Sequence, residues 1–387
     1  MTRHDPGREP SSPELSGPAS PGSEPSGSAG DLPTDRLPDP ERRLPDALGV
    51  VAARPEAGGG AATPSFEPPS GAPSGVPGIP EPLRIGPRLF TWGERTYVMG
   101  IVNVTPDSFS GDGLLATGGD VVVAAVALAD RMVAEGADIL DIGGESSRPG
   151  HGAVSAAEER RRVVAVVAAI HAAHPTVPLS VDTTKPGVAA AALDAGASLV
   201  NDTWGVAEDG ALVALAAERG VPIVLMHNRA EARYSSVVAE VIADLQRAID
   251  RALRAGVPWD SVVVDPGFGF GKAPLHNLAL LRDLAVLRIL GRPVLLGTSR
   301  KSTLGKVLDL PPDKRLEATL ATTALGIAAG VDIIRVHDVR DNVRAARMAD
   351  AIVRGWPAGG AAAGAAGSAA GPAGTAAAGG SRRGARG

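Results

Sequence analysis

Between about residues 83 and 356, short apolar runs alternate with longer amphipathic segments. The runs are rich in Val, Ile and Leu, which indicates buried strands, whereas the Ala- and Leu-rich segments between them indicate helices. Strict alternation of strand and helix predicts a parallel sheet. The expected strands are residues 98–102, 139–142, 179–181, 199–200, 223–225, 262–264, 294–296 and 333–336.

The number of these units distinguishes between two α/β folds. About eight β–α units in roughly 270 residues fit a closed (β/α)8 TIM barrel better than an open doubly wound sheet. The Rossmann-like sheet is the main alternative, and it would carry a G-x-G-x-x-G motif after its first strand. No such motif follows residues 99–105. We therefore predict an α/β TIM barrel with its active site at the C-terminal ends of the strands.

Composition changes sharply at both ends of the chain. Residues 1–82 are rich in Pro, Gly, Ser, Ala and Glu, and residues 357–387 form an Ala/Gly tract with a basic tip. Neither segment shows sustained periodicity, so neither can bury enough apolar surface to offset the entropy lost on ordering. We predict two disordered tails around one folded domain, residues 83–356.

Charge and cysteine content exclude several classes of protein. The formal net charge of −5 provides no basic field for nucleic acid. The absence of cysteine excludes disulfides, thiolate nucleophiles and Cys-ligated zinc. The first residues lack the apolar core of a signal peptide, and no uncharged stretch reaches membrane-spanning length. We expect a cytoplasmic protein that binds small molecules and neither membrane nor nucleic acid.

Polar side chains recur where the expected strands end. Any one of them could cap the next helix or form an Asx turn. Because a barrel gathers the C-terminal ends of its strands on one face, we expect the set to converge on one pocket. The residues are Asn103, Asp182, Asn201, Asp265, Lys301, Arg335 and His337.

The loop from Asp265 to Lys272 carries three glycines directly after an expected strand, which favours close approach of a ligand to the backbone. It is not a Walker A phosphate loop, because its spacing differs from G-x-x-x-x-G-K-[ST] and Ala273 follows the lysine. The sequence gives Lys272 no role. No H-x-x-x-H pair supports a zinc site, and we expect His227 to be a structural, hydrogen-bonded histidine.

Several motifs together resemble the bacterial dihydropteroate synthases of folate biosynthesis. The resemblance covers about residues 83–356 and holds in the order and spacing of the motifs. They are MGIVNVTPDSFS at 99–110, GGESSRPG at 143–150, SVDT at 180–183, ND at 201–202, LMHN at 225–228, DPGFGFGK at 265–272, SRKS at 299–302 and RVHDV at 335–339.

The resemblance implies condensation of 6-hydroxymethyl-7,8-dihydropterin diphosphate with 4-aminobenzoate, giving 7,8-dihydropteroate and pyrophosphate. Acceptors would face the amino and N–H groups of the pterin edge and a donor would face its carbonyl. The implied pterin-binding residues are Asp182, Asn201, Met226, Asp265 and Lys301. Of these, Asp182, Asp265 and Lys301 would also act in catalysis, together with Arg335 and His337.

The remaining implied residues surround the diphosphate and the second substrate. Ser147, Arg335 and His337 would bind the diphosphate, and Asn103 would bind Mg2+ through its amide oxygen. His337 has an alternative interpretation as a hydrogen-bonded histidine at the end of the last strand. The residues implied for 4-aminobenzoate are Phe109, Ser147, Arg148, Pro149 and Ser302.

Two other functions share parts of this pattern. A methyltetrahydrofolate-dependent methyltransferase would use the same barrel and pterin set, but it has no use for Lys301, Ser302 or the Arg335/His337 pair. A non-catalytic pterin-binding paralogue would keep the site without turnover. The family resemblance also implies a homodimer.

Overall fold

A computed structural model describes residues 78–105, 120–145, 154–206 and 210–356. Most of the two tails, residues 1–77 and 357–387, lies outside the described residues. Phe109, Ser147, Arg148 and Pro149 also lie outside them, so their predicted roles stay predictions.

Eight parallel strands form the centre of the described domain, in the order β8-β7-β6-β5-β4-β3-β10-β9. Val294, the residue directly before β9, forms a parallel bridge with Val264 of β8, which closes the ring. Every strand expected from the sequence is present, so the predicted TIM barrel is confirmed. The strands are β3 (Tyr97–Asn103), β4 (Ile139–Gly143), β5 (Leu179–Asp182), β6 (Leu199–Asp202), β7 (Ile223–Met226), β8 (Val262–Asp265), β9 (Leu295–Leu296) and β10 (Ile333–Val336).

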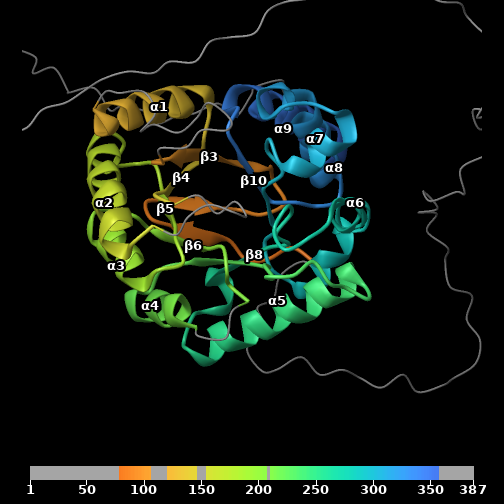
Figure 1. The fold of residues 1–387 in the computed structure, drawn as a ribbon, viewed down its shortest axis with the longest axis horizontal. Helices are drawn as coiled ribbons and strands as arrows, with labels where there is room; N and C mark the ends of the chain where they lie inside the picture. Colours follow the sequence, from red (N-terminus) through yellow and green to blue (C-terminus); the bar gives the residue numbers. More distant parts are fainter. Residues whose placement is uncertain (1–77, 106–119, 146–153, 207–209, 357–387) are drawn as a thin grey trace, which may run out of the picture. The chain divides into compact units, whose positions relative to one another are not determined.

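Helices lie around this ring of strands (Figure 1). Local signals set their ends: Asp120 accepts a hydrogen bond from Val122 N at 2.8 Å where α1 begins, and Gly136 ends α1 with φ 104°. None of the described helices is long and apolar enough to cross a membrane. The helices are α1 (Val121–Glu135), α2 (Ala156–Ala173), α3 (Pro186–Asp194), α4 (Ala211–Arg219), α5 (Val237–Arg254), α6 (Pro274–Arg282), α7 (Ser302–Leu308), α8 (Leu316–Ala328) and α9 (Val339–Val353), with 3-10 turns η2 (Trp259–Ser261), η3 (Leu284–Leu290) and η4 (Pro312–Lys314).

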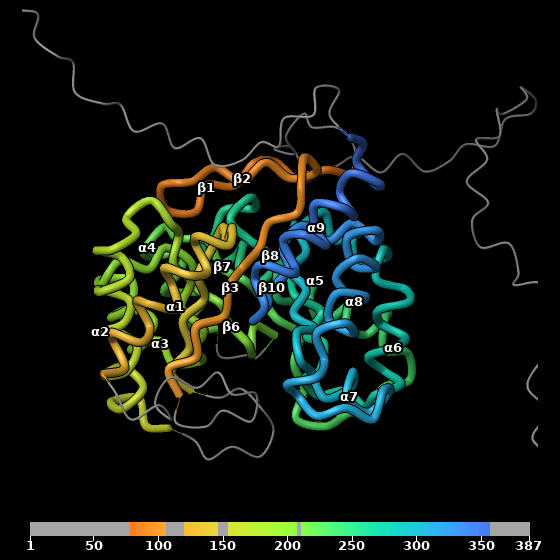
Figure 2. Tube along the Cα trace, turned by 90° about the horizontal axis from the view of Figure 1, so that it is seen from above, coloured from red at the N-terminus to blue at the C-terminus, as the bar shows by residue number. Residues whose placement is uncertain are grey.

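A hairpin that the sequence did not reveal precedes the barrel. Its strands β1 (Leu83–Ile85) and β2 (Arg88–Phe90) pair antiparallel, and the hairpin lies across one end of the barrel (Figure 2). Its buried residues Leu83, Ile85 and Phe90, with Trp92, belong to the same cluster as the apolar side chains inside the barrel. The hairpin therefore covers the end of the barrel interior.

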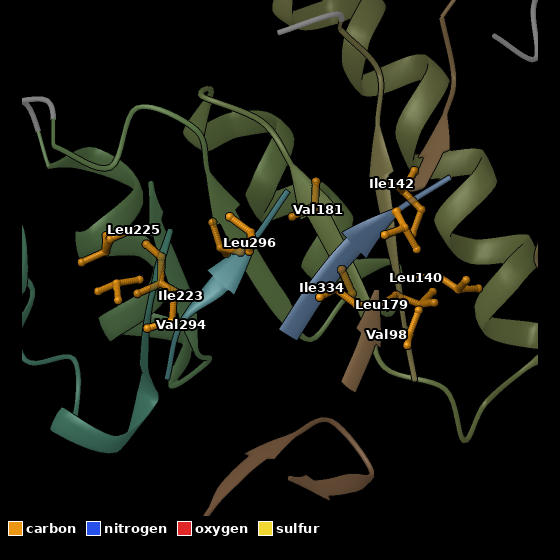
Figure 3. Packing of buried hydrophobic residues seen from close by; sticks show 14 of the residues in the cluster. Val98, Leu140, Ile142, Leu179, Val181, Ile223, Leu225, Val294, Leu296 and Ile334 are labelled. Atoms are coloured by element: carbon orange, nitrogen blue, oxygen red, sulfur yellow. The ribbon is translucent and has the colours of Figure 1, made fainter. Parts of the chain in front are cut away.

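The strands contribute to two separate apolar layers because alternate residues face opposite sides. Leu140 and Ile142 of β4 face outward into the cluster shared with the helices, together with Leu179 and Val181 of β5 (Figure 3). Ile139 faces inward. The inward layer is Tyr97, Met99, Ile139, Leu199, Val224, Val263, Leu295 and Ile333.

Two residues further along the same strands, the inward positions become mostly polar. Ile139 is followed by Asp141, Leu199 by Asn201, Val263 by Asp265 and Ile333 by Arg335. The apolar layer holds the barrel together, and the polar layer above it forms the floor of the C-terminal face.

Candidate active site

A cavity of about 580 Å3 opens at the C-terminal ends of the strands. A ligand of pterin size fits a cavity of this volume. Asp182 and Ser302, both predicted from the sequence, line it together with the glycine-rich loop. Its lining is Glu145, Glu159, Asp182, Thr183, Thr184, Thr203, Trp204, Asn228, Arg229, Ala230, Ala232, Gly269, Phe270, Gly271, Lys272 and Ser302.

Arg335 is the centre of the polar floor. Its Nη2 donates to Asp182 Oδ2 at 2.7 Å, and its Nε donates to Asp141 Oδ2 at 2.6 Å. Asn201 Nδ2 donates to the same Asp141 oxygen at 3.1 Å. The structure therefore brings together three predicted residues, Asp182, Asn201 and Arg335, through a fourth that the sequence did not reveal.

Asp141 escaped notice because it lies inside β4 and not after it. A signal for it was present in the sequence: Asp141 is two residues after Ile139, on the inward face of a strand that is otherwise apolar. The side chain is fully buried, and its Oδ1 has no hydrogen-bond partner among the described residues.

One guanidinium faces two buried carboxylates in this floor. Burial raises the pKa of Asp182 to about 7, the charge of Arg335 opposes the rise, and Asp141 adds to it. Burial also acts to lower the pKa of Arg335, but Asp141 and Asp182 outweigh it and raise that pKa. Asp141 and Asp182 therefore compete for a single positive charge.

Asp265 ends β8 beside the same floor. Its Oδ1 accepts the Gly267 N–H at 2.7 Å. Burial raises the pKa of Asp265, while the Gly267 N–H and the charge of Lys301 oppose the rise. The Nζ of Lys301 lies 3.6 Å from the centroid of the Phe270 ring, a cation–π contact. The structure thus groups Asp265 with Lys301, as predicted, and adds Phe270 as an aromatic wall of the cavity.

The backbone just before Lys301 is unusual. Arg300 has φ 56°, a left-handed conformation that non-glycine residues rarely adopt. Arg300 Nη2 pairs with Asp338 at 2.6 Å, and its backbone N–H donates to Thr319 Oγ1 at 3.2 Å. These contacts stabilise the turn from which Lys301 and Ser302 project at the start of α7.

His337 follows β10 and is oriented by Ser299. Its backbone N–H donates to Ser299 Oγ at 3.2 Å, and the hydroxyl lies 2.9 Å from His337 Nδ1. Asn103 is half-buried at the last position of β3, and Met226 is buried at the last position of β7. All three lie at the C-terminal ends of their strands, as expected.

His227 has the structural environment that we predicted. The side chain is fully buried, and its Nε2 lies 3.0 Å from Asp244 Oδ2. Burial lowers its pKa to about 4, with Lys272 adding to the decrease and Asp244 opposing it. Glu145, which the sequence did not single out, also lines the cavity: its Oε1 accepts the Val154 N–H at 2.8 Å, and its Oε2 pairs with Lys185.

The donor set can be tested against the predicted Mg2+ ion. Among the described residues, no three His, Cys, Asp or Glu side chains gather around one possible ion position. Asn103 offers a hard amide oxygen at the strand ends. This set fits an ion that takes one protein ligand and completes its shell with water and substrate oxygens, as Mg2+ commonly does.

Comparison with known proteins agrees with this geometry. A family model for pterin binding enzymes matches residues 99–337. The dihydropteroate synthase of Clostridium beijerinckii is 46% identical over 273 residues, covering 70% of this chain and 100% of the relative. The dihydropteroate synthase of Bacillus subtilis is 48% identical over 267 residues, covering 69% of this chain and 92% of the relative.

Solved structures give the same result. A dihydropteroate synthase from Clostridium difficile in the presence of pteroic acid superposes with a TM-score of 0.64 at 46% identity, over 68% of this chain and 99% of that one. The Xanthomonas albilineans enzyme in complex with 7,8-dihydropteroate superposes with a TM-score of 0.63 at 42% identity, over 70% of this chain and 98% of that one. The chain therefore belongs to the pterin-binding enzymes. Within that family it is a member of the dihydropteroate synthases.

Proposed function

We propose that this chain condenses 6-hydroxymethyl-7,8-dihydropterin diphosphate with 4-aminobenzoate, giving 7,8-dihydropteroate and pyrophosphate. The observation that carries the proposal is the buried polar floor, in which Asp182, Asn201 and Arg335 meet around Asp141 below an open cavity. The match to two synthases over 100% and 92% of their own length supports the same reaction.

The pterin edge requires acceptors for its amino and N–H groups. Asn201 accepts through its amide oxygen. Its Nδ2 donates to Asp141, so the oxygen is the end of the amide that is left to face the pterin. Asp182 and Asp265 supply carboxylate oxygens, and Lys301 donates to the ring carbonyl. Each such group left unpaired in a buried site would cost about 1–3 kcal/mol, which makes this edge the source of pterin specificity. Met226 packs against the ring.

The diphosphate is bound by Arg335, His337 and Ser147. Ser299 orients the His337 ring through its contact with Nδ1, which leaves Nε2 as the ring nitrogen available to the diphosphate. Asn103 would hold Mg2+ through its amide oxygen, and the bound ion would supply positive charge to the diphosphate leaving group.

Substitution follows a dissociative course. The bond between the pterin methylene and the diphosphate breaks first, and the pair of electrons leaves with pyrophosphate. Asp182 and Asp265 stabilise the cationic methylene electrostatically, and the amine of 4-aminobenzoate then attacks it and releases one proton to solvent. No side chain acts as a nucleophile. Ser302, Phe109, Ser147, Arg148 and Pro149 form the 4-aminobenzoate site.

A pyrophosphate assay tests the reaction. The purified protein is incubated with Mg2+, the pterin diphosphate and 4-aminobenzoate, and pyrophosphate release is measured against reactions that lack one substrate. Release that requires both substrates is expected. Pterin binding without release would identify the non-catalytic paralogue instead, and methyl transfer from methyltetrahydrofolate would identify the methyltransferase.

We also propose a cytoplasmic homodimer. Exposed apolar side chains on the neighbouring helices α8 and α9 support self-association, among them Leu325, Met348 and Ile352. Light scattering of Leu325→Asp, compared with the wild type at equal concentration, tests this assignment. A dimeric wild type and a monomeric variant are expected, and a variant that stays fully dimeric would place the interface elsewhere.

A further inference from the structure

Lys272 ends the glycine-rich loop between β8 and α6, and the proposed reaction gives it no part. Its Nζ lies 2.9 Å from His227 Nδ1, 3.0 Å from the Gly267 carbonyl oxygen and 3.1 Å from that of Phe270. The His227 carbonyl oxygen is 3.4 Å away. All four partners are acceptors, and an ammonium group has three N–H donors and no acceptor. One side chain therefore joins the loop after β8 to the loop after β7.

The imidazole of His227 is prepared for this contact. Its lowered pKa keeps the ring neutral at neutral pH, so one nitrogen donates and the other accepts. Nε2 faces the Asp244 carboxylate and must carry the proton. Nδ1 is then the acceptor that Lys272 requires. Burial lowers the pKa of Lys272 itself to about 7, so the surroundings disfavour its charge while supplying it only with acceptors.

The two loops are packed together at their backbones. A Cβ at Gly267 would lie 1.7 Å from the His227 carbonyl oxygen, and a Cβ at Gly271 would lie 2.2 Å from that of Arg229. Tyr234 adds a hydrogen bond from its hydroxyl to the Gly271 carbonyl at 2.9 Å. The glycines permit this approach, and Lys272 supplies polar contacts across it.

The peptides that accept hydrogen bonds from Lys272 adjoin two groups of the site: Asp265, and Phe270, which lines the cavity. Gly267 is shared: its N–H donates to Asp265 Oδ1 and its carbonyl accepts from Lys272. The Phe270 carbonyl also accepts from Lys272, and the Phe270 ring lies below Lys301. A displacement of the ammonium would therefore reach both the carboxylate and the aromatic wall through one peptide each.

We propose that Lys272 is a positioning residue, which fixes the Asp265 carboxylate for the pterin and, for 4-aminobenzoate, the Phe270 ring, which lines the cavity together with Ser302. This inference rests on the proposed function, because it assigns Lys272 to the same substrates. Lys272 acts through its neighbours and not by contact with the reacting atoms.

A double-mutant cycle tests the inference. Affinity for 6-hydroxymethylpterin is measured for the wild type, Lys272→Met, Asp265→Asn and the double variant. Methionine preserves much of the lysine volume without its donors, and asparagine at 265 retains an acceptor for the Gly267 N–H. Lys272→Met is expected to weaken binding about tenfold in the wild type and less than about threefold in the Asp265→Asn background. Exposed Lys314→Met is the matched control and should bind as the wild type does.

The kinetic constants give a second readout. Because the Phe270 ring moves with the same loop, Lys272→Met should raise the KM for 4-aminobenzoate, while Lys314→Met should not. Equal losses of pterin affinity in both backgrounds would overturn the inference, since Lys272 would then act independently of Asp265. If Lys272→Met does not fold, the same cycle is measured with Lys272→Gln. Equal losses of pterin affinity in the wild-type and Asp265→Asn backgrounds would then overturn the inference in the same way. A wild type that binds no pterin would instead overturn the proposed function and this inference with it.

Discussion

Two buried carboxylates share one guanidinium in the floor of the site, and this imbalance determines how the centre ionises. Asp141 and Asp182 each bind one edge of Arg335, so the three side chains carry one net negative charge when both acids are ionised. Burial makes that charge costly, which is why the pKa of Asp182 rises to about 7. Removal of Asp141 should therefore lower the pKa of Asp182.

Pterin binding should therefore depend on pH near neutrality. Protonation turns one acceptor oxygen of Asp182 into an O–H donor that would face the N–H donors of the pterin edge, so affinity for 6-hydroxymethylpterin is expected to rise as pH increases through about 7. Asp141→Asn removes the neighbouring charge that raises the pKa of Asp182, so the midpoint should move to lower pH. Calorimetric titration between about pH 5.5 and 8.5 measures both profiles. An unchanged midpoint in Asp141→Asn would contradict the coupling, and the surface variant Asp250→Asn is the control.

Stability should depend on pH through His227. Burial lowers its pKa from 6.5 to about 4, so the unfolded chain binds more protons than the folded chain between these values. The stabilisation is complete above about pH 6.5 and is lost as pH falls toward 4, by up to roughly 3 kcal/mol. Urea unfolding at several pH values should show this slope in the wild type and in the exposed-position control His171→Gln. A slope that persists unchanged in His227→Gln would assign it to other groups.

At the scale of elements, the sequence could predict the strands because they are buried on both faces and most of them end at or beside a Gly, Asp or Asn. The hairpin β1–β2 could not be predicted in this way, since its strands are three residues long and show too little alternation. Asp141 could not be predicted for a different reason: polar residues after the strands mark the site in the sequence, whereas the polar layer begins inside the strands. The Arg300 and Asp338 pair depends on a turn conformation, and no periodicity encodes it.

The glycine-rich loop gives a prediction at this scale. Gly267 has φ 68°, and a Cβ there would lie 1.7 Å from the His227 carbonyl oxygen, so Gly267→Ala must displace the loop. We expect loss of most pterin affinity and destabilisation of at least about 2 kcal/mol. Gly187→Ala in α3 is the matched control, because a Cβ there meets nothing within 4 Å. It should retain binding and gain about 0.5–1 kcal/mol of stability. Equal behaviour of the two variants in thermal unfolding and pterin titration would refute the packing argument.

At the scale of the whole molecule, the barrel separates stability from function along its axis. The polar layer and the cavity lie at the C-terminal ends of the strands, and the apolar inner layer continues into the β1–β2 hairpin at the other end. The position of the functional residues on one face could be predicted from the sequence, because a TIM barrel gathers the C-terminal ends of its strands there. It did not reveal how the opposite end is covered, since that depends on a few apolar residues whose packing partners are distant in the chain.

Two truncated forms of the chain should test whether stability and function are separated along the barrel axis. Residues 1–77 precede the first described residue, and their removal is expected to leave pyrophosphate release and the thermal midpoint unchanged. The cut must spare Gly78, whose carbonyl accepts a hydrogen bond from Arg288 at 2.9 Å.

Removal of residues 1–92 deletes four buried apolar side chains, Leu83, Ile85, Phe90 and Trp92. At about 1.5–3 kcal/mol each, their loss approaches the whole stability of an ordinary domain, about 5–15 kcal/mol. We expect this shorter form to unfold or aggregate, although it keeps every predicted site residue. Circular dichroism melting and the pyrophosphate assay on both truncations measure the difference. If the chain that begins after residue 92 melted at the wild-type temperature, the hairpin would have no stabilising role. If the chain that begins at residue 78 lost activity, residues 1–77 would contribute to the reaction after all.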